Sequence, residues 1–307
     1  MKNLEYLPYA FFERKIVPTE EAKVSIMTNA LQYGTGVIGG IRCYLAGDKK
    51  TMNIFRLVDH YKRFLNSLKI LNVSIPFNHQ KLVELTLALA RKNKPQTDSY
   101  IRPFAYAANI GLSPDLSHAE MDLAIYMIPL GEYLPLSRGL KLAVSNWMRI
   151  TDRMIPARAK ISGGYINSAM ARGDVARLGF DDALMMDDRG HITEASAANI
   201  FIVRDGVLIT PSKYSDVLEG MTRRTIIELA SDLKIKVEER EIDRSEIYVA
   251  DEVFLSGTGV QVAWIDEVDG RKIGKGRIGP ITHKLQKLFF DIVRGKEKKY
   301  SHWLTKV

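Results

Sequence analysis

Apolar residues at helical spacing are the clearest pattern in the N-terminal part of the chain. A helix over 57–71 is predicted from apolar residues that would share one helix face: Leu57, Tyr61, Phe64, Leu65 and Leu68. A second amphipathic helix is predicted over 79–92. Two later runs, 100–109 and 121–129, are typical of strands. We therefore expect both helices to cover one face of a sheet that contains these strands.

The remaining segments mix short strands with helices. Short strands are predicted over 6–17, 23–27, 41–45, 52–55, 140–145, 206–210 and 252–255, with a turn at Pro18-Thr19. Helices are predicted over 165–178, over 222–233 with Thr222 as N-cap, from Asp243, and over 281–294 after Pro280. Asp269-Gly270 predicts a hairpin turn. Because strands and helices do not alternate regularly, a dinucleotide-binding fold is disfavoured and an α+β fold is expected.

Length and loop composition predict two domains. At 307 residues, the chain is long for one hydrophobic core. Segment 131–138 contains glycine, proline and serine and interrupts the pattern, so it is the predicted interdomain loop. The prediction is a small N-terminal α/β domain over 1–130 and a large C-terminal α/β domain over 139–307, with a cleft between them. The large domain would carry Lys160.

Composition and charge narrow the classes of function. Hydrophobic residues make up 46% and charged residues 26% of the chain, which is ordinary for a soluble globular protein. The net charge is +8, but lysines and arginines are scattered, and no basic stripe alternates with stacking aromatic residues. Nucleic-acid binding is therefore not expected. A non-enzymatic basic binding protein stays open as an alternative class.

The cysteine count and the hydropathy of the N-terminal part predict the cellular compartment of the protein. The single cysteine, Cys43, excludes an intrachain disulfide and a cysteine-rich metal site, and it fits a reducing compartment. The N-terminus lacks the apolar core of a signal peptide. The uncharged run over 24–41 contains glycines, Asn29 and Gln32, so we interpret it as buried structure around a site rather than a membrane span. We expect a cytoplasmic protein without a metal site or a membrane partner.

Two charged residues have apolar or small neighbours. Lys160 stands between Ala159 and Ile161, which would desolvate its amine in part. Desolvation lowers the pKa of an amine, as a Schiff-base lysine requires. Glu194 lies in a predicted strand with no basic residue close in sequence, so it is a candidate to face a ligand. A solvated surface lysine and a glutamate on the wet face of the strand are the alternatives.

These residues belong to motifs that follow one another along nearly the whole chain. The motifs are Gly39-Gly40-Ile41-Arg42-Cys43-Tyr44, Tyr100-Ile101-Arg102-Pro103, Ala159-Lys160-Ile161-Ser162-Gly163-Gly164-Tyr165-Ile166-Asn167-Ser168, Gly179-Phe180-Asp181-Asp182-Ala183-Leu184, Ile192-Thr193-Glu194, Asn199-Ile200-Phe201, Leu218-Glu219-Gly220-Met221-Thr222-Arg223 and Glu252-Val253-Phe254-Leu255-Ser256-Gly257-Thr258. The set resembles the fold-type IV pyridoxal-phosphate enzymes, the branched-chain amino acid aminotransferases in particular. The resemblance implies a two-domain α+β fold like that of D-amino acid aminotransferase, with pyridoxal 5′-phosphate as cofactor.

The resemblance also implies which residues hold the cofactor. Lys160 matches the catalytic lysine, which forms the Schiff base and then acts as the base that moves a proton from Cα of the amino acid. Glu194 matches the carboxylate beside the pyridine nitrogen, and Tyr165 matches the phenol that bonds the ring oxygen. The implied phosphate-binding residues are Arg63, Met221, Thr222 and Thr258. An exposed helix position for Arg63, and simple capping or turn formation for the others, are the alternatives.

Further matches concern the substrate. Arg102 and Tyr33 match residues that read the distal carboxylate of glutamate, and Thr258 and Gly259 match the turn whose amides hold the α-carboxylate. The other implied substrate residues are Ile38, Tyr100, Leu112 and Tyr133. Leu112 matches a residue supplied across a dimer interface, so a homodimer or a higher assembly of dimers is implied. For Arg102, a structural ion pair is the alternative.

The implied reaction transfers the amino group of leucine, isoleucine or valine to 2-oxoglutarate, giving the 2-oxo acid and L-glutamate. A D-amino acid or (R)-amine transaminase and an aminodeoxychorismate lyase of the same family are alternatives, and Arg102 favours the branched-chain enzyme. One departure stands out. Ile38-Gly39-Gly40 replaces the common Phe-Glu-Gly, which predicts a roomier side-chain pocket.

Overall fold

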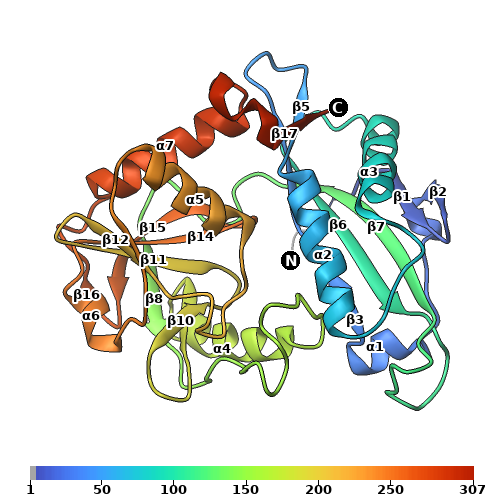
Figure 1. Ribbon diagram of the computed structural model, residues 1–307, viewed down its shortest axis with the longest axis horizontal. Helices are drawn as coiled ribbons and strands as arrows, with labels where there is room; N and C mark the ends of the chain where they lie inside the picture. Colours follow the sequence, from blue (N-terminus) through green and yellow to red (C-terminus); the bar gives the residue numbers. More distant parts are fainter. Residues whose placement is uncertain (1–4) are drawn as a thin grey trace. The chain divides into compact units, whose positions relative to one another are not determined.

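The computed structural model describes residues 5–307, which form two compact units (Figure 1). Unit 1 comprises the chain up to Gly131 together with Ala159–Gly164 and Asp291–Val307. Unit 2 comprises Glu132–Arg158 and Tyr165–Phe290. Each unit combines one large sheet with helices, so the α+β prediction is confirmed.

Unit 1 is built on an eight-stranded sheet with the order β17-β5-β4-β6-β7-β1-β2, in which β3 also pairs with β6. Its strands are β1 (Tyr9–Phe12), β2 (Lys15–Pro18), β3 (Gly36–Ile38), β4 (Ile41–Leu45), β5 (Met52–Phe55), β6 (Ser99–Ala107), β7 (Met121–Pro129) and β17 (Leu304–Lys306). Its helical segments are η1 (Thr19–Glu21), α1 (Asn29–Tyr33), α2 (Leu57–Ile70), α3 (His79–Asn93) and η2 (Lys298–Trp303). All strand pairs in this sheet are antiparallel.

The hydrophobic core of unit 1 lies between this sheet and the helices α2 and α3 (Figure 1). Tyr61 and Leu68 of α2 and Leu82 of α3 are buried against Ile101 and Ile125 of the central strands. The predicted helical spacing is therefore confirmed, because the apolar stripe of each helix is the face that packs on the sheet. A smaller apolar cluster around Phe12, Val17 and Tyr106 lies on the other face of the sheet.

Two segments that are distant in sequence complete unit 1. β17 pairs with β5, and Ile161 forms an isolated bridge with Val37 of β3. These backbone hydrogen bonds satisfy peptide groups that edge strands would otherwise leave unpaired. As a result, the segment with Lys160 and the C-terminal residues group with unit 1, whereas the sequence assigned both to the C-terminal domain. The first break, at Gly131, lies at the predicted interdomain loop.

Unit 2 is built on a nine-stranded sheet whose strands β10, β9, β8, β15, β14 and β11 form a closed ring, because β10 pairs with both β9 and β11. β12 and β13 extend the sheet beyond β11, and β16 pairs with β15. The strands are β8 (Leu140–Val144), β9 (Asp182–Met186), β10 (Ile192–Ala195), β11 (Asn199–Arg204), β12 (Val207–Thr210), β13 (Val237–Glu239), β14 (Glu252–Gly257), β15 (Gln261–Val268) and β16 (Arg271–Lys272). The helices that begin in this unit are α4 (Tyr165–Arg177), α5 (Met221–Asp232), α6 (Arg244–Tyr248) and α7 (Pro280–Val293).

Several local predictions are wrong. The hairpin turn between β1 and β2 lies at Glu13-Arg14, both with positive φ, and not at Pro18-Thr19. Residues 23–27 form no strand. Thr222 is not the N-cap of α5, because the helix already begins at Met221 and Gly220 is its N-cap. The turn at Asp269-Gly270 is confirmed, since it joins β15 to β16.

The prediction that the uncharged run over 24–41 is buried is wrong for much of its first part. Ile26 is 83% exposed, and Val24, Met27 and Leu31 are exposed as well. The later part of the run, from Gly36 to Ile41, is largely buried in β3 and its connection to β4. None of the helices within residues 5–307 is both long and apolar enough to cross a bilayer.

Candidate active site

Lys160 lies in a turn whose backbone is held from two sides. Its carbonyl accepts the N–H of Ile38 at 2.9 Å, and its own N–H donates to Oγ of Ser67 on α2 at 3.1 Å. Ser162 continues the contact with its hydroxyl, which donates to the carbonyl of Gly34 at 2.7 Å. Lys160 itself is half-buried. The turn is therefore a defined structure and not a mobile surface loop.

Glycine is required where this turn meets the chain before β3. A Cβ on Gly34 would lie 2.6 Å from Cα of Gly163, and Gly34 has a φ of +66°. The N–H of Gly163 donates to the carbonyl of Gly34 at 3.0 Å. The two backbones thus approach more closely than side chains would allow, which keeps the turn with Lys160 against β3.

Glu194 of β10 is the centre of a buried polar cluster in unit 2. Its side chain is 6% exposed, and Oε1 lies 2.9 Å from Nη2 of Arg149. Oε2 accepts Nδ2 of Asn199 at 3.0 Å and the N–H of Leu218 at 3.2 Å. The sequence offered no basic neighbour, but the fold brings Arg149 from the segment after β8. Sequence reasoning missed Arg149, because nothing local relates it to Glu194.

The start of α5 lies beside the same cluster. Met221 and Thr222 are buried, and no side chain caps the helix at Gly220. A Cβ on Gly220 would lie 2.2 Å from Oδ1 of Asn199, so glycine is needed there. The first amide groups of a helix have no partner within the helix, and they attract anions. Asn199 therefore contacts both the start of α5 and the Glu194 carboxylate.

Tyr133 and the turn after β14 form a second group in unit 2. A Cβ on Gly259 would be 3.6 Å from the ring of Tyr133, so the ring lies over this glycine next to Thr258. Arg172 of α4 donates to the hydroxyl of Tyr133, and its guanidinium carbon is 5.3 Å from the ring centroid. Arg172 is a second residue that sequence reasoning missed. Tyr165 is half-buried at the beginning of α4.

In unit 1, three predicted substrate residues share the sheet face opposite the helices. Ile38 pairs with Phe104, and Tyr100 pairs with Arg42, so Ile38, Tyr100 and Arg102 point to one side. Gly40 allows the hydroxyl of Tyr100 to approach, because a Cβ there would lie 2.0 Å from it. The structure therefore brings these three positions onto one surface.

Arg102 has no ion-pair partner on this surface. Its Nη2 donates to the hydroxyl of Tyr100 at 3.2 Å, and its guanidinium carbon is 5.0 Å from the Tyr100 ring centroid. Its Nε is buried and has no hydrogen-bond partner. Within the described part of the chain, no carboxylate lies close enough to Arg102 for a salt bridge. The alternative of a structural ion pair is therefore not supported.

The remaining predicted positions of unit 1 are spread over α1, α2 and the segment after β6. Tyr33 donates its hydroxyl to the carbonyl of Leu112 at 2.8 Å and makes no hydrogen bond to Arg102. Leu112 is 85% exposed. Arg63 of α2 is half-buried, and its carbonyl accepts the hydroxyl of Ser67.

His60 is a buried titratable residue near these cations. Burial lowers the pKa of His60 well below its ordinary value, and the charges of Arg63, Lys160 and Arg56 lower it further. Nδ1 of His60 is buried without a partner. The imidazole is therefore neutral at physiological pH. The sequence shows a histidine three residues before Arg63 in the predicted helix, but no motif indicated that it would be buried.

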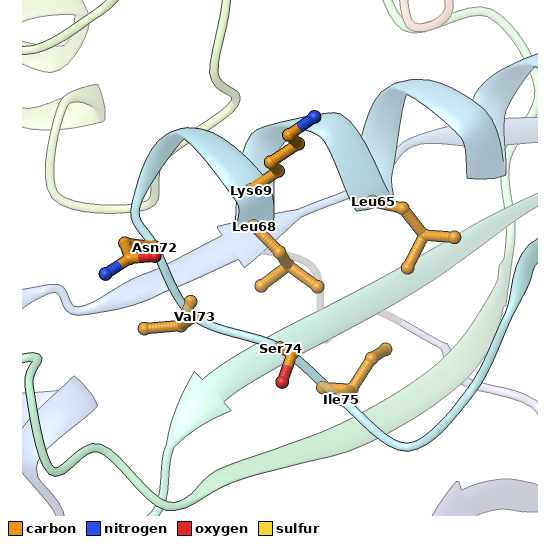
Figure 2. A pocket seen from close by; sticks show the side chains of 7 residues that line it. All are labelled: Leu65, Leu68, Lys69, Asn72, Val73, Ser74 and Ile75. Atoms are coloured by element: carbon orange, nitrogen blue, oxygen red, sulfur yellow. The ribbon is translucent and has the colours of Figure 1, made fainter.

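A pocket of about 340 Å³ lies at the C-terminal end of α2 (Figure 2). It is lined by Leu65, Leu68, Lys69, Asn72, Val73, Ser74 and Ile75. Figure 2 shows Leu65 and Leu68 extending from the helix towards the following loop, whereas Lys69 points away from it. None of the predicted site residues lines this pocket. Among residues 5–307, no cluster of histidine, cysteine, aspartate and glutamate is suited to a metal ion.

Comparison with known proteins identifies the class to which this site belongs. Residues 45–268 match the model of the amino-transferase class IV family. The chain belongs to this family. It is 44% identical to a probable branched-chain-amino-acid aminotransferase from Aquifex aeolicus (strain VF5), an alignment that covers 98% of this chain and 97% of that protein.

Two solved structures extend the comparison. The branched-chain aminotransferase of Thermoproteus uzoniensis with norvaline has a TM-score of 0.94 and 40% identity, and the match covers 98% of this chain and 99% of that one. The branched-chain amino acid aminotransferase of Thermobaculum terrenum in its PLP-form has a TM-score of 0.94 and 35% identity, with the same coverage. The fold is therefore shared along nearly the full length.

Proposed function

We propose that this chain is a pyridoxal-phosphate-dependent aminotransferase that transfers amino groups between leucine, isoleucine or valine and 2-oxoglutarate. The observation that carries the proposal is the buried Glu194 carboxylate, fixed by Arg149, Asn199 and the Leu218 amide. Such an anion suits a protonated ring nitrogen. The full-length relatives named branched-chain aminotransferases support the choice of substrate.

The residues fit the cofactor at three points. Glu194 offers a fixed carboxylate to the pyridine nitrogen, and Arg149 compensates its buried charge. The uncapped start of α5, with Met221 and Thr222, offers amide groups and a hydroxyl to the phosphate. Arg63 and Thr258 are the further phosphate donors in this proposal. When bound, pyridoxal phosphate supplies an electron sink for the carbanion that forms at Cα of the amino acid.

The chain's own residues then perform defined tasks. Lys160 would hold the cofactor through Nζ. Once the substrate's amino group has displaced it, the freed Nζ would take the proton from Cα of the amino acid, and in the opposite half-reaction it would deliver a proton to Cα of the 2-oxo acid. The turn with Lys160 is held by Ile38 and Ser67, so Nζ starts from a fixed backbone. Tyr165 donates its hydroxyl to the ring oxygen. The amide of Gly259 holds the α-carboxylate.

Arg102 is the proposed binding residue for the dicarboxylic substrates, glutamate and 2-oxoglutarate. Its guanidinium has no carboxylate partner in the described chain, and its buried Nε is unpaired. A buried donor without a partner is unfavourable, so a ligand carboxylate at this position is stabilised. We infer that Arg102 binds the distal carboxylate of glutamate and 2-oxoglutarate. Tyr33 would assist only after its hydroxyl releases the Leu112 carbonyl, to which it donates at 2.8 Å in this structure. Ile38, Tyr100 and Tyr133 are the residues that we propose to contact the branched side chain.

A homodimer, or an assembly of dimers, is part of this proposal. An exposed apolar patch in unit 1 comprises Ile26, Met27, Leu31, Tyr33, Ile110 and Leu112. Hydrogen bonds from Gln32 to the carbonyl of Gly111 and from Tyr33 to the carbonyl of Leu112 hold its two segments together. Patches of this kind mark interaction sites. A second copy is the occupant, because the resemblance places Leu112 across a dimer interface.

The domain division and the location complete the proposal. We place the interdomain loop at 131–138, with the turn that carries Lys160 and the C-terminal residues added to the N-terminal domain. A cytoplasmic location remains a prediction from the single free thiol, Cys43, which is buried. Pyridoxal phosphate and the amino and 2-oxo acids are the proposed small-molecule partners, without nucleic acid or membrane.

Spectroscopic titration with pyridoxal phosphate, followed by reduction and a half-reaction with leucine, tests the function. Added pyridoxal phosphate should give the protein a yellow absorption band, and borohydride should then attach the cofactor covalently to the peptide with Lys160. Leucine alone should bleach the band in a single half-reaction, and Lys160→Ala should lose turnover while it keeps the fold. A folded protein that takes up no pyridoxal phosphate contradicts the proposal. Bleaching by D-amino acids or (R)-1-phenylethylamine, but not by leucine, would instead favour the alternative transaminases.

A further inference from the structure

Ser67 connects the turn with Lys160 to the helix that carries Arg63. The residue lies on α2 and is 1% exposed. Its Oγ accepts the N–H of Lys160 at 3.1 Å and donates to the carbonyl of Arg63 at 3.1 Å. One hydroxyl therefore bonds to the backbone of both residues.

The direction of these hydrogen bonds is fixed by chemistry. A serine hydroxyl has one proton and two lone pairs. The Arg63 carbonyl can only accept, so the Ser67 proton points to it, and a lone pair remains for the N–H of Lys160. Because the bond to Arg63 spans one helical turn, it also restricts the rotation of the Ser67 side chain. The acceptor offered to Lys160 is therefore pre-positioned.

We propose that Ser67 is a positioning residue that sets the spacing between the Lys160 anchor and the Arg63 phosphate site. This inference rests on the proposed function. A cofactor attached through Lys160 at one point and bound by Arg63 at another has a rigid ring between the two. A displacement of about 1 Å in such a site is enough to reduce a rate on the order of a hundredfold. Ser67 acts through the backbone of Lys160 and does not contact the reacting atoms.

The same hydroxyl does more than stabilise a helix. The carbonyl of Lys160 accepts from Ile38 on β3, while its N–H donates to Ser67 on α2. The peptide groups of the lysine are thus held by a strand on one side and by a helix on the other. Loss of Ser67 would free the turn to move relative to α2, although its bonds to β3 would remain.

The chain offers a matched control for this test. Thr86 on α3 is fully buried and donates its hydroxyl to the carbonyl of Leu82 at 2.9 Å, one helical turn earlier. It also bonds to the hydroxyl of Tyr61 and is not bonded to the lysine turn. Thr86→Val therefore removes a comparable buried hydroxyl from the same unit without touching Lys160.

The experiment compares Ser67→Ala, Ser67→Thr and Thr86→Val with the parent protein. Hydrogen exchange of the Lys160 amide is measured without cofactor, and the dissociation constant of pyridoxal phosphate is measured by absorbance titration. In Ser67→Ala we expect amide exchange about tenfold faster and a dissociation constant about tenfold higher, as the loss of a buried acceptor predicts. Ser67→Thr, which keeps the hydroxyl, should restore most of both values.

The outcomes separate positioning from stability. Thr86→Val should lower the melting temperature and leave both readouts at the parent values. The inference would be overturned if Lys160 amide exchange and the dissociation constant of pyridoxal phosphate changed equally in Ser67→Ala and Thr86→Val, or changed in neither variant. If Ser67→Ala does not fold, Ser67→Cys keeps the volume with a weaker acceptor and should show a smaller shift in the same direction. A parent protein that binds no pyridoxal phosphate contradicts the proposed function, whereas unchanged Lys160 exchange in Ser67→Ala contradicts this inference alone.

Discussion

Nη2 of Arg149 lies 2.9 Å from Oε1 of Glu194, and the two side chains are only 11% and 6% exposed. Both charges have lost most of their water, so each depends on the other for compensation. The carboxylate that the sequence singled out is therefore paired with an arginine that only the fold brings to it.

Arg149→Met should destabilise the protein by about 3–5 kcal/mol, because it leaves the charge of Glu194 buried without its cation. Adding Glu194→Gln to this variant should recover most of the loss in the free energy of unfolding, but not the activity. Urea unfolding and the rate of the leucine half-reaction measure the two effects. Lys81→Met is the control, since both side chains of its pair with Glu84 are exposed. A double variant as unstable as the single one would contradict the charge-pair explanation.

Arg102→Ala should impair the glutamate half-reaction more than the leucine half-reaction. Only glutamate brings a distal carboxylate, and a charge-assisted hydrogen bond contributes about 1.5–3 kcal/mol, or roughly 10- to 150-fold. Single-turnover rates with each donor give the ratio directly. Arg91→Ala, at an exposed position of α3, should leave both rates unchanged. Equal losses with both donors would show that Arg102 has a structural task instead.

Ile38→Phe tests whether the departure from Phe-Glu-Gly widens the pocket. The added ring should lower kcat/KM for phenylalanine relative to leucine, by about tenfold, because it removes one or two methylenes of room. Gly39→Glu is unsuitable as a companion, since a Cβ on Gly39 would lie 2.3 Å from Cγ of Pro103. An unchanged ratio in Ile38→Phe would show that this position does not shape the pocket.

Ile26→Asp and Leu112→Asp should weaken the proposed dimer. Each places a charge in the exposed apolar patch, where burial against a second copy would cost several kcal/mol. Sedimentation analysis should show monomers at concentrations at which the parent is dimeric. Leu178→Asp is the control, since Leu178 is 75% exposed but lies outside the patch. A parent that is already monomeric, or patch variants that remain dimeric, would refute this interface.

His60 should make stability depend on pH. The folded state holds the His60 imidazole neutral, because its pKa is well below 6.5, whereas the unfolded chain takes up a proton near pH 6.5. Stability is therefore fully present above that pH and decreases below it, by up to about 1.4 kcal/mol per pH unit, until the folded-state pKa is reached. In His60→Gln, the slope of unfolding free energy between pH 7 and 5 should be shallower. His283→Gln, at an exposed position, should retain the parent slope.

Local patterns were sufficient for the elements with strong periodicity. The helix predicted over 57–71 is α2, and the strands predicted over 41–45 and 52–55 have the observed bounds of β4 and β5. The helix is predictable because its apolar stripe is the face that packs on the sheet, and the two strands because β4 and β5 are short, mostly apolar runs that are buried almost throughout. The Thr222 N-cap failed because a neighbouring glycine, Gly220, meets Asn199 and ends the extended segment two residues earlier.

The sequence by itself determined the α+β class and the family, and it predicted Lys160, Glu194 and Arg102 as site residues, because contiguous motifs carry them. Only the tertiary structure decided their partners. Arg149 reaches Glu194, Ser67 reaches Lys160, and β10 closes the ring of unit 2 by pairing with both β9 and β11. Hydrogen bonds and compensated charges act over about 3 Å, so they depend on which distant segments the packed core brings together. No local propensity encodes that proximity.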